Sequence, residues 1–312
     1  MSKSKDRWCS YKWETKIYVR LPLNFCAMNK RPFFLFLLFL FLSVCAYSQS
    51  DSLTLVNAQW SCDSVHGMVL KTLHFKHQEY FNSNQFMAIL EIPVHSGHGL
   101  ALAHEPVRTR TSVMAKRHAA VAAVNGSFFD MDKHNPICYL RIDGKEVGIN
   151  EPGKDTVNRK YYQYGTLVID SGRPQIVQTD SNRMWERSLP FSDIMTAGPL
   201  LIYKGRNQPM RNDLSFVHSR HPRTAIGIRS DGTVLLFVVD GRMKLSAGMS
   251  LDELIQTLRW LGCSDALNLD GGGSTTLYIK DAPHGGIVNH PTDNALFDYA
   301  GERAVSNAVL VY

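Results

Sequence analysis

The segment Asp270–Thr276, DGGGSTT, combines a carboxylate, three consecutive glycines and three hydroxyl side chains. Apolar runs flank it at Ala266–Leu269 and Leu277–Ile279, so the motif follows the end of a predicted buried strand. Glycines let a ligand approach the backbone closely, and successive N–H groups in such a turn form an anion-binding concavity. A glycine-rich hairpin turn is the alternative interpretation. We predict that the motif binds an anion through Gly271, Gly272, Gly273, Ser274 and Thr275.

A helix is predicted directly before this motif. Ser250 and Glu253 have the spacing of a capping box, and apolar residues recur at helical spacing until Gly262. The helix connects two apolar runs, Thr233–Val239 and Ala266–Leu269. A strand, a crossover helix and a second strand in one sheet almost always form a right-handed parallel unit. We therefore expect a βαβ unit around residues 233–270.

Asp240 and Asp270 follow the two strands of this predicted unit. If the strands are neighbours, about 4.8 Å apart, the two carboxylates lie within the distance of catalytic acid/base pairs. A third apolar run ends at Asn125, and ligands in open α/β sheets bind beyond the carboxyl ends of strands. Each polar residue alone could cap a turn, but three such strand ends together indicate a site.

Arginines near these strand ends supply the positive charge that a phosphate needs. Arg242 follows Asp240 by two residues, and Arg223 directly precedes the apolar run 224–228. A guanidinium binds two phosphate oxygens at once. Either arginine could instead be a structural partner of an aspartate.

The positive net charge belongs to the N-terminus. The chain has 34 Lys+Arg and 28 Asp+Glu, of which residues 1–48 hold eight and two, which leaves 26 of each. A neutral remainder gives no support for nucleic-acid binding, which needs a concentrated basic face.

The N-terminal segment has the pattern of a secretory signal. Lys30 and Arg31 precede the apolar run Phe33–Leu42, and Ala46 and Ser48 are the small residues that a signal peptidase reads. We expect export to the periplasm or the extracellular space, with a mature start near Gln49. An uncleaved segment would anchor the protein to the envelope and would be its one contact with a membrane.

Three cysteines follow the signal, Cys62, Cys138 and Cys263, and their spacing fits no metal site. At most one disulfide can form, and buried thiols are the interpretation we favour because a mature chain of this length buries a sizeable core. The sequence requires no cofactor, although the two aspartates are compatible with a divalent cation.

The predicted fold class is α+β, with mixed β-sheets and flanking helices. We divide the chain into an N-terminal extension with the signal at 1–48, a β-rich portion at 49–112 and a domain at 113–312. A helix is expected near 109–118 and a surface loop at 150–162. Strands are expected at residues 53–60, 68–75, 85–92, 119–124, 138–142, 164–170, 200–203, 224–228, 233–239, 266–269, 275–279 and 304–311.

Five motifs occur in a fixed order in the second half of the chain. They are RHPRTAIGI at Arg220–Ile228, VVDGR at Val238–Arg242, SAGMSLDEL at Ser246–Leu254, LGCSDALNLDGGGSTT at Leu261–Thr276 and RAVSNAV at Arg303–Val309. This ordered set resembles the phosphodiester glycosidase family, and the resemblance extends over roughly Val113 to Tyr312. One departure is Ser127, where the resemblance leads us to expect a glycine.

The resemblance implies hydrolysis of the bond between a sugar anomeric carbon and a phosphodiester oxygen, as in an α-N-acetylglucosaminyl phosphodiester. The glycine motif with Arg223 or Arg242 would then bind the phosphate, and Asn125 a sugar hydroxyl or N-acetyl group. Asp270 or Asp240 would act as nucleophile or as base for water. Two alternatives remain open: a metal-assisted phosphodiesterase that cleaves the P–O bond, and a non-catalytic envelope module that binds glycan phosphates.

Overall fold

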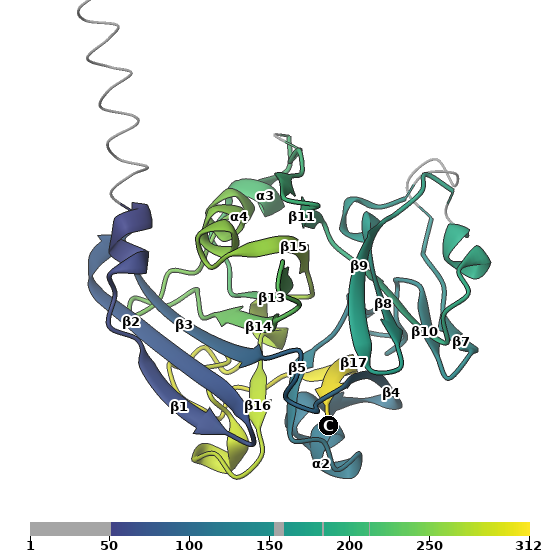
Figure 1. Cartoon of the computed structure of the whole chain (residues 1–312), viewed down its shortest axis with the longest axis horizontal. Helices are drawn as coiled ribbons and strands as arrows, with labels where there is room; N and C mark the ends of the chain where they lie inside the picture. Colours follow the sequence, from purple (N-terminus) through teal and green to yellow (C-terminus); the bar gives the residue numbers. More distant parts are fainter. Residues whose placement is uncertain (1–50, 153–158, 183, 212) are drawn as a thin grey trace, which may run out of the picture. The chain divides into compact units, whose positions relative to one another are not determined.

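The structure is a computed structural model that describes residues 51–152, 159–182, 184–211 and 213–312 (Figure 1). The described residues all belong to one compact unit. The predicted signal therefore lies outside the described residues. Within the described residues, no helix is both long and apolar enough to cross a membrane.

The largest sheet has eight strands in the order β1-β2-β3-β14-β13-β15-β11-β12. Its strands are β1 (Ser61–Val65), β2 (Met68–Tyr80), β3 (Ser83–Ile92), β11 (Leu200–Tyr203), β12 (Arg206–Asn207), β13 (Arg223–Arg229), β14 (Val234–Val239) and β15 (Cys263–Asn268). β14 is buried along its whole length because apolar side chains cover both faces of the sheet at its centre.

Two smaller sheets complete the β structure. A five-stranded sheet has the order β7-β6-β10-β8-β9, and a four-stranded sheet the order β16-β5-β17-β4. The first contains β6 (Leu140–Ile142), β7 (Lys145–Gly148), β8 (Gly165–Asp170), β9 (Arg173–Gln178) and β10 (Asp193–Ala197). The second contains β4 (Leu100–Arg110), β5 (Ala122–Asn125), β16 (Leu277–Ile279) and β17 (Ala304–Val311).

One hydrophobic core joins the three sheets. Leu90 and Leu236 of the eight-stranded sheet, Leu167 of the five-stranded sheet and Val124 and Val309 of the four-stranded sheet all belong to it. Figure 1 shows the five-stranded sheet and the four-stranded sheet beside the eight-stranded one. Burial of this apolar surface is the main force that fixes the strand ends relative to one another.

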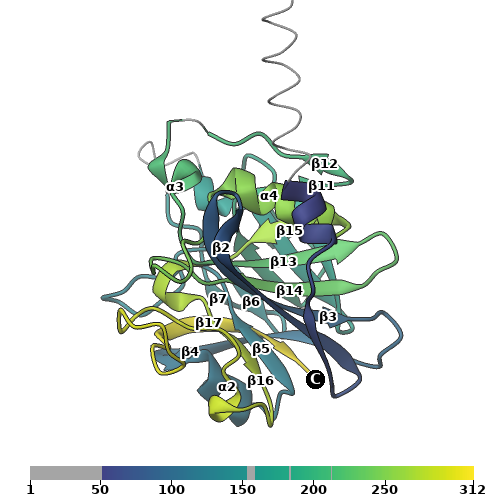
Figure 2. The same ribbon diagram turned by 90° about the vertical axis from the view of Figure 1, so that its left-hand side faces the viewer.

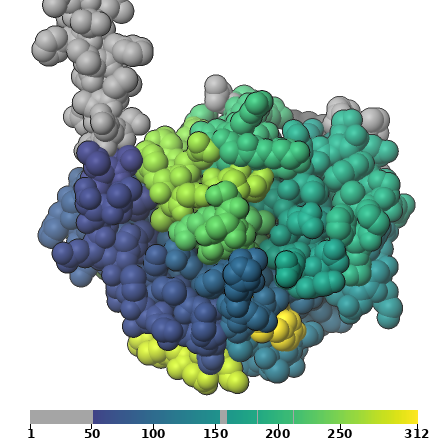
Figure 3. All heavy atoms as spheres, viewed as in Figure 1, coloured from purple at the N-terminus to yellow at the C-terminus, as the bar shows by residue number. Residues whose placement is uncertain are grey.

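The helices cover the outer faces of the sheets. α4 (Leu251–Trp260) packs Leu254 and Leu258 on a second core that also holds Leu55, and Figure 3 shows purple residues of the described N-terminal end beside the green surface of this region. Figure 2 shows α4 above β13 and β14. The other helices are α2 (Thr111–Arg117), α3 (Ser215–His218) and the 3-10 turns η1 (Tyr161–Gln163), η2 (Trp185–Ser188), η3 (Gly272–Ser274) and η4 (His284–Gly286).

The capping box predicted for α4 is confirmed. The Ser250 hydroxyl accepts a hydrogen bond from the Glu253 backbone N–H at 3.2 Å, and the Glu253 carboxylate accepts from the Ser250 N–H at 2.9 Å. Reciprocal caps of this kind satisfy two backbone donors at a helix start, which is why the sequence locates it accurately.

The predicted βαβ unit is wrong in one respect. β13 lies between β14 and β15 and pairs antiparallel with both, so the two outer strands run in the same direction without being neighbours. All strand pairs of the described residues are antiparallel rather than mixed. Asp240 and Asp270 therefore follow strands separated by a third one.

Most predicted strands are present with shifted ends. The exception is 53–60, where residues 51–56 are helical. Strands β1, β4, β7, β9, β10 and β12 have no counterpart in the prediction. The predicted loop 150–162 lies partly outside the described residues, and η1 occupies its end. Cys138 and Cys263 are buried free thiols, as favoured, whereas Cys62 is exposed.

Candidate active site

Asn125 and Asp270 meet where β5 and β15 end, as the sequence predicts. The Asn125 amide donates to the Asp270 carbonyl at 2.6 Å, and the Asp270 N–H donates to the Gly126 carbonyl at 3.0 Å. The Asn125 side-chain oxygen accepts from the Thr224 hydroxyl and from the Thr276 N–H. Because both polar atoms of this buried amide bind protein groups, Asn125 positions the Asp270 loop rather than presenting a free amide to a sugar.

The glycine motif forms the 3-10 turn η3 and not the open nest that we predicted. Most of its N–H groups have partners within the protein: Gly271 donates to the Asp270 carboxylate, Gly272 to the Pro222 carbonyl at 2.9 Å, and Thr275 to the Gly272 carbonyl. The motif therefore does not present a row of free N–H groups, and side chains must supply most of the contacts to an anion.

Hydroxyl groups remain as free donors at this turn. The hydroxyls of Thr275, Thr276 and Thr292 and the His221 Nδ1 atom are buried without a hydrogen-bond partner in the described part of the chain. Buried polar atoms are almost always paired, so the unpaired hydroxyls of Thr275 and Thr276 in the glycine motif indicate a bound polar group. These side chains fit phosphate or sugar oxygens as partners.

Asp240 is buried and binds a loop that the sequence prediction did not include. Its Oδ1 atom accepts from the Asn289 amide at 2.8 Å, and its Oδ2 atom accepts from the His290 N–H at 2.9 Å and from His290 Nδ1 at 2.8 Å. Asn289 also donates to the Thr275 carbonyl, and thus connects Asp240 to the glycine turn. Burial raises the pKa of Asp240, and the hydrogen bonds from His290 and Asn289 oppose this rise.

His290 is held in one orientation by this carboxylate and by aromatic neighbours. Its ring stacks on Phe297 with centroids 3.9 Å apart, and lies 4.6 Å from the Phe86 ring and 4.6 Å from the Tyr299 ring. Because Nδ1 is hydrogen-bonded to Asp240, Nε2 is the ring nitrogen left to contact a ligand.

Asp270 differs from Asp240 in its surroundings. It is partly exposed, and desolvation raises its pKa to about 6, while Ser274, the Gly271 N–H, Arg303 and Arg242 act in the opposite direction. A carboxyl with this pKa ionises near neutral pH and can take or give a proton there.

Arg242 presents its guanidinium to the glycine turn. The side chain is exposed, and a Cβ atom at Gly272 would lie 2.9 Å from its Nη2 atom. No acidic side chain of the described residues forms an ion pair with it, whereas Arg303 is bound to Asp293. Arg242 is therefore the arginine of this site whose charge is available to an anion.

Arg223 occupies a different position from the one we predicted. Its Nε atom donates to the Met249 carbonyl at 2.9 Å, its Nη2 atom donates to the Phe216 and Ser219 carbonyls, and only 1% of the residue is exposed. Burial and the charge of Arg242 lower its pKa to about 10. These contacts make Arg223 a residue that fixes the loop before β13.

The described residues contain no group of three or more His, Cys, Asp and Glu side chains placed to hold a metal ion. Sequence reasoning missed Asn289, His290 and Arg303, which all contact or influence the two aspartates. Asn289 and His290 follow no regular strand pattern, and their one available signal was the polar cluster NHPTD between Val288 and Asn294. Arg303 lies in the motif RAVSNAV, directly before a predicted strand, but was given no role.

These findings define a mostly-β domain in which Asp270 and Arg242 lie at the glycine turn, and Asn289 connects that turn to Asp240. The family model described as "Phosphodiester glycosidase" matches residues 118–312, more than half of the chain, so the chain belongs to this family of hydrolases.

Two relatives illustrate the similarity at the sequence level. The mouse N-acetylglucosamine-1-phosphodiester alpha-N-acetylglucosaminidase is 34% identical over 204 residues, which cover 61% of this chain and 37% of the mouse protein. A prophage-derived uncharacterized protein of Bacillus subtilis is 37% identical over 92 residues, 30% of this chain and 13% of that protein. The chain thus spans well under half the length of these relatives.

Among solved structures, the fold resembles that of a zebrafish N-acetylglucosamine-1-phosphodiester alpha-N-acetylglucosaminidase catalytic domain. The TM-score is 0.61 at 19% identity, and the match covers 81% of this chain and 88% of that one. A hypothetical protein from Synechocystis matches with a TM-score of 0.55 at 17% identity, over 81% of this chain and 63% of that one.

Proposed function

We propose that this protein hydrolyses the bond between a sugar anomeric carbon and a phosphodiester oxygen, in a substrate such as an α-N-acetylglucosaminyl phosphodiester. The products are a free sugar and a phosphomonoester. The observation that carries the proposal is that two groups lie at the same turn. One is Asp270, whose pKa is raised to about 6, and the other is Arg242, whose guanidinium is available beside Gly272.

Arg242 and the free threonine hydroxyls supply phosphate binding in this proposal. A guanidinium and neutral donors together match the oxygens of a phosphodiester, which carries one negative charge. They stabilise the leaving phosphate as the C–O bond breaks, so that less help from a general acid is needed than for an alcohol leaving group. Gly272 is the residue that leaves room for the guanidinium.

Asp270 is the reacting carboxylate of the proposed mechanism. As a carboxylate it either attacks the anomeric carbon or removes a proton from the attacking water, and it stabilises the oxocarbenium-like transition state in both cases. Asp240 is a positioning residue, because its buried oxygens hold Asn289 and His290. His290 Nε2 then exchanges a proton with water or with the substrate.

The N-terminal pattern places this reaction outside the cytoplasm in our proposal. A neutral mature chain in the periplasm or extracellular space would meet phosphodiesters of cell-wall or exopolysaccharide glycans. The predicted signal supports this setting, and N-terminal sequencing of the secreted protein tests it.

The proposed reaction is tested by incubation with an N-acetylglucosamine α-1-phosphodiester while free sugar is measured. We expect turnover by the wild type and a loss of several orders of magnitude in Asp270→Asn, with an unchanged circular dichroism spectrum. Asp132→Asn, a substitution of an exposed aspartate, serves as matched control. Near-full activity of Asp270→Asn would show that the reacting group lies elsewhere. Binding of the phosphodiester without turnover by the wild type would favour a non-catalytic module.

A further inference from the structure

An ion pair between Asp293 and Arg303 lies against the glycine turn. The Arg303 Nε atom donates to the Asp293 Oδ1 atom at 2.7 Å, and its Nη2 atom donates to the same oxygen. A Cβ atom at Gly273 would lie 2.5 Å from Arg303 Nη2 and 2.6 Å from Asp293 Oδ1. Only a residue without a Cβ atom leaves room for both side chains at this position, three residues after Asp270.

The same two residues close the loop that carries a ring partner of His290. The Asp293 N–H donates to the Gly301 carbonyl at 3.1 Å, and Arg303 directly precedes β17. The loop between them contains Phe297, on which the His290 ring stacks. The ion pair therefore holds the Arg303 guanidinium in one place, between this loop and the glycine turn.

The charge of Arg303 acts on Asp270. Burial raises the pKa of Asp270, whereas the charges of Arg303 and Arg242 lower it, because a nearby cation favours the ionised carboxyl. The two arginines differ in their partners: Arg303 is paired with Asp293, while Arg242 forms no ion pair with the described residues. The Asp293 anion offsets part of the Arg303 charge, so Arg303 stabilises the Asp270 carboxylate less than a free guanidinium would.

Other titratable groups near Asp270 have a smaller influence on its charge. Burial raises the pKa of the Cys138 thiol, which is therefore neutral near pH 6. Asp240 is bound by His290, and it is connected to the glycine turn through the neutral amide of Asn289. The two arginines are thus the principal charges that act on the Asp270 carboxyl.

We propose that Arg303 is a positioning residue of the reaction: held by Asp293 against Gly273, it keeps Asp270 in the carboxylate form, and Asp293 limits how strongly it does so. This inference rests on the proposed function, in which Asp270 reacts as a carboxylate. Because the two halves of the ion pair have opposite charges, removal of one half changes the ionisation of Asp270 in the opposite direction from removal of the other.

The test is the acid limb of the pH profile, the fall of kcat/KM at low pH, measured with an N-acetylglucosamine α-1-phosphodiester. We expect the limb to move to higher pH in Arg303→Gln and to lower pH in Asp293→Asn. Each shift should be about one pH unit, the lower end of the effect of a neighbouring charge. Arg303→Lys keeps the positive charge and should leave the limb close to that of the wild type.

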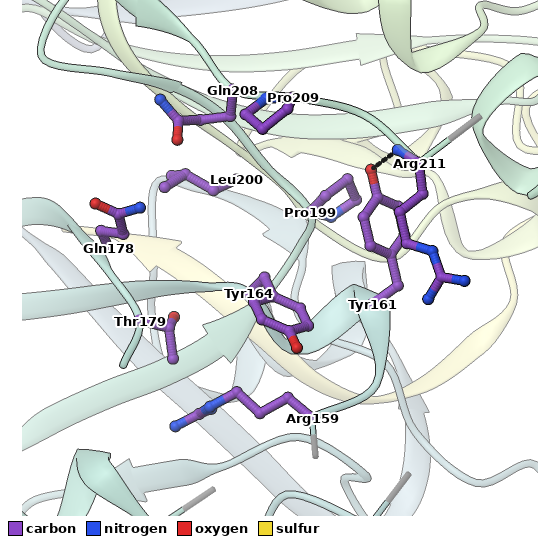
Figure 4. Close-up of a pocket in the computed structure, with 10 residues that line it drawn as sticks. All are labelled: Arg159, Tyr161, Tyr164, Gln178, Thr179, Pro199, Leu200, Gln208, Pro209 and Arg211. Atoms are coloured by element: carbon purple, nitrogen blue, oxygen red, sulfur yellow. Dashed lines mark hydrogen bonds between the residues drawn. The ribbon is translucent and has the colours of Figure 1, made fainter. Parts of the chain in front are cut away.

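The matched controls are Arg211→Gln and Asp213→Asn. Arg211, which is drawn beside Tyr161 in Figure 4, forms an exposed ion pair with Asp213. It lines a cavity of about 290 Å³ to which neither Asp270 nor Arg303 contributes. Loss of this ion pair should leave the acid limb unchanged.

Opposite shifts distinguish control of the Asp270 charge from a merely structural contact. An acid limb that moves in the same direction in Arg303→Gln and Asp293→Asn, or in neither, would overturn the proposed role of Arg303 while the measured turnover supports the proposed function.

If the wild type does not hydrolyse the diester, the proposed function fails, and the ionisation of Asp270 is measured directly. Carboxyl ¹³C NMR of aspartate-labelled protein follows its titration, with the Asp270 signal assigned through Asp270→Asn. Titration midpoints that shift in opposite directions in Arg303→Gln and Asp293→Asn support the action of the ion pair on Asp270. Midpoints that are unchanged, or that shift in the same direction, overturn it.

Discussion

The Asp240 carboxylate fixes His290 by two hydrogen bonds to a single oxygen, from Nδ1 at 2.8 Å and from the backbone N–H at 2.9 Å. Two bonds from one residue define both the position of the loop and the orientation of the ring. The second aspartate, Asp270, has no such partner and lies partly exposed at the glycine turn. In the proposed mechanism the two aspartates therefore have separate tasks: Asp240 positions His290, and Asp270 reacts.

This division predicts a non-additive effect of substitutions at Asp240 and His290. We expect His290→Ala to lower kcat by about 10²–10⁴, the usual contribution of a proton-transfer group. The double variant Asp240→Asn with His290→Ala should lose no more than His290→Ala alone, because Asp240 acts through the histidine. Steady-state kinetics of both variants and of Asp240→Asn alone test this, with His118→Ala, a substitution of an exposed histidine, as control.

Losses that multiply in the double variant would contradict this assignment. They would show that Asp240 contributes to the reaction independently of His290.

The contact between Gly272 and Arg242 predicts a binding defect. Gly272 has a φ of 63°, and a Cβ atom there would lie 2.9 Å from the guanidinium. Gly272→Ala should displace Arg242 and raise KM for the phosphodiester about tenfold, the size of one lost charge-assisted contact. Gly144→Ala is a matched control, since Gly144 has a φ of 74° with no atom within 4 Å of the added Cβ.

Both glycine variants should lose a similar amount of stability, because both force alanine into the left-handed region. If KM rises equally in Gly272→Ala and Gly144→Ala, or in neither, the Arg242 guanidinium does not bind the phosphate.

The raised pKa of Asp270 predicts the acid limb of the pH profile. The reacting form is the carboxylate, so kcat/KM should fall below pH 6, where the group becomes protonated. Arg242 lowers this pKa, so Arg242→Gln should move the acid limb to higher pH. Activity that instead falls above pH 6 would make Asp270 a general acid.

We expect the partly desolvated carboxylate of Asp270 to lower the free energy of unfolding when it is ionised. The pKa of Asp270 is about 6 in the folded chain and near 3.8 when unfolded, so the folded state binds more protons between these values. Wild-type stability therefore decreases as pH rises through this window. Asp270→Asn lacks this penalty, and its free energy of unfolding should exceed that of the wild type by about 1–3 kcal/mol above pH 6, with little difference below pH 4.

Chemical denaturation at several pH values measures this difference, with Asp132→Asn as control. A variant that is less stable than the wild type at pH 7 would indicate a structural role for Asp270.

Local signals made parts of the site predictable. The two residues of the α4 capping box, Ser250 and Glu253, are close in sequence, so the helix start was predictable. The apolar runs before Asn125 and Asp270 predicted that these two residues come at the ends of buried strands. Long-range pairing was not predictable, because the insertion of β13 between β14 and β15 depends on contacts distant in sequence. The same reason explains the assignment of Arg223 to the substrate. In the sequence it is a charged residue directly before an apolar run, and only the fold shows that it is buried.

His290 shows the other limit of sequence reasoning. It lies in an irregular stretch with no periodic pattern, and only the folded chain brings it to Asp240, 50 residues earlier. The glycine motif was predicted as an anion-binding cradle; it forms the 3-10 turn η3, and most of its N–H groups bind partners within the protein, among them the Pro222 carbonyl. The free donors are side-chain hydroxyls of the same segment.

The central claim is cleavage of the bond to the anomeric carbon, with Asp270 at that carbon. Hydrolysis in ¹⁸O-labelled water, followed by mass spectrometry of both products, tests it most directly. Cleavage at the anomeric carbon places the label in the released sugar and none in the phosphomonoester. Label in the phosphomonoester would show P–O cleavage, the reaction of a metal-assisted phosphodiesterase, and would contradict the account.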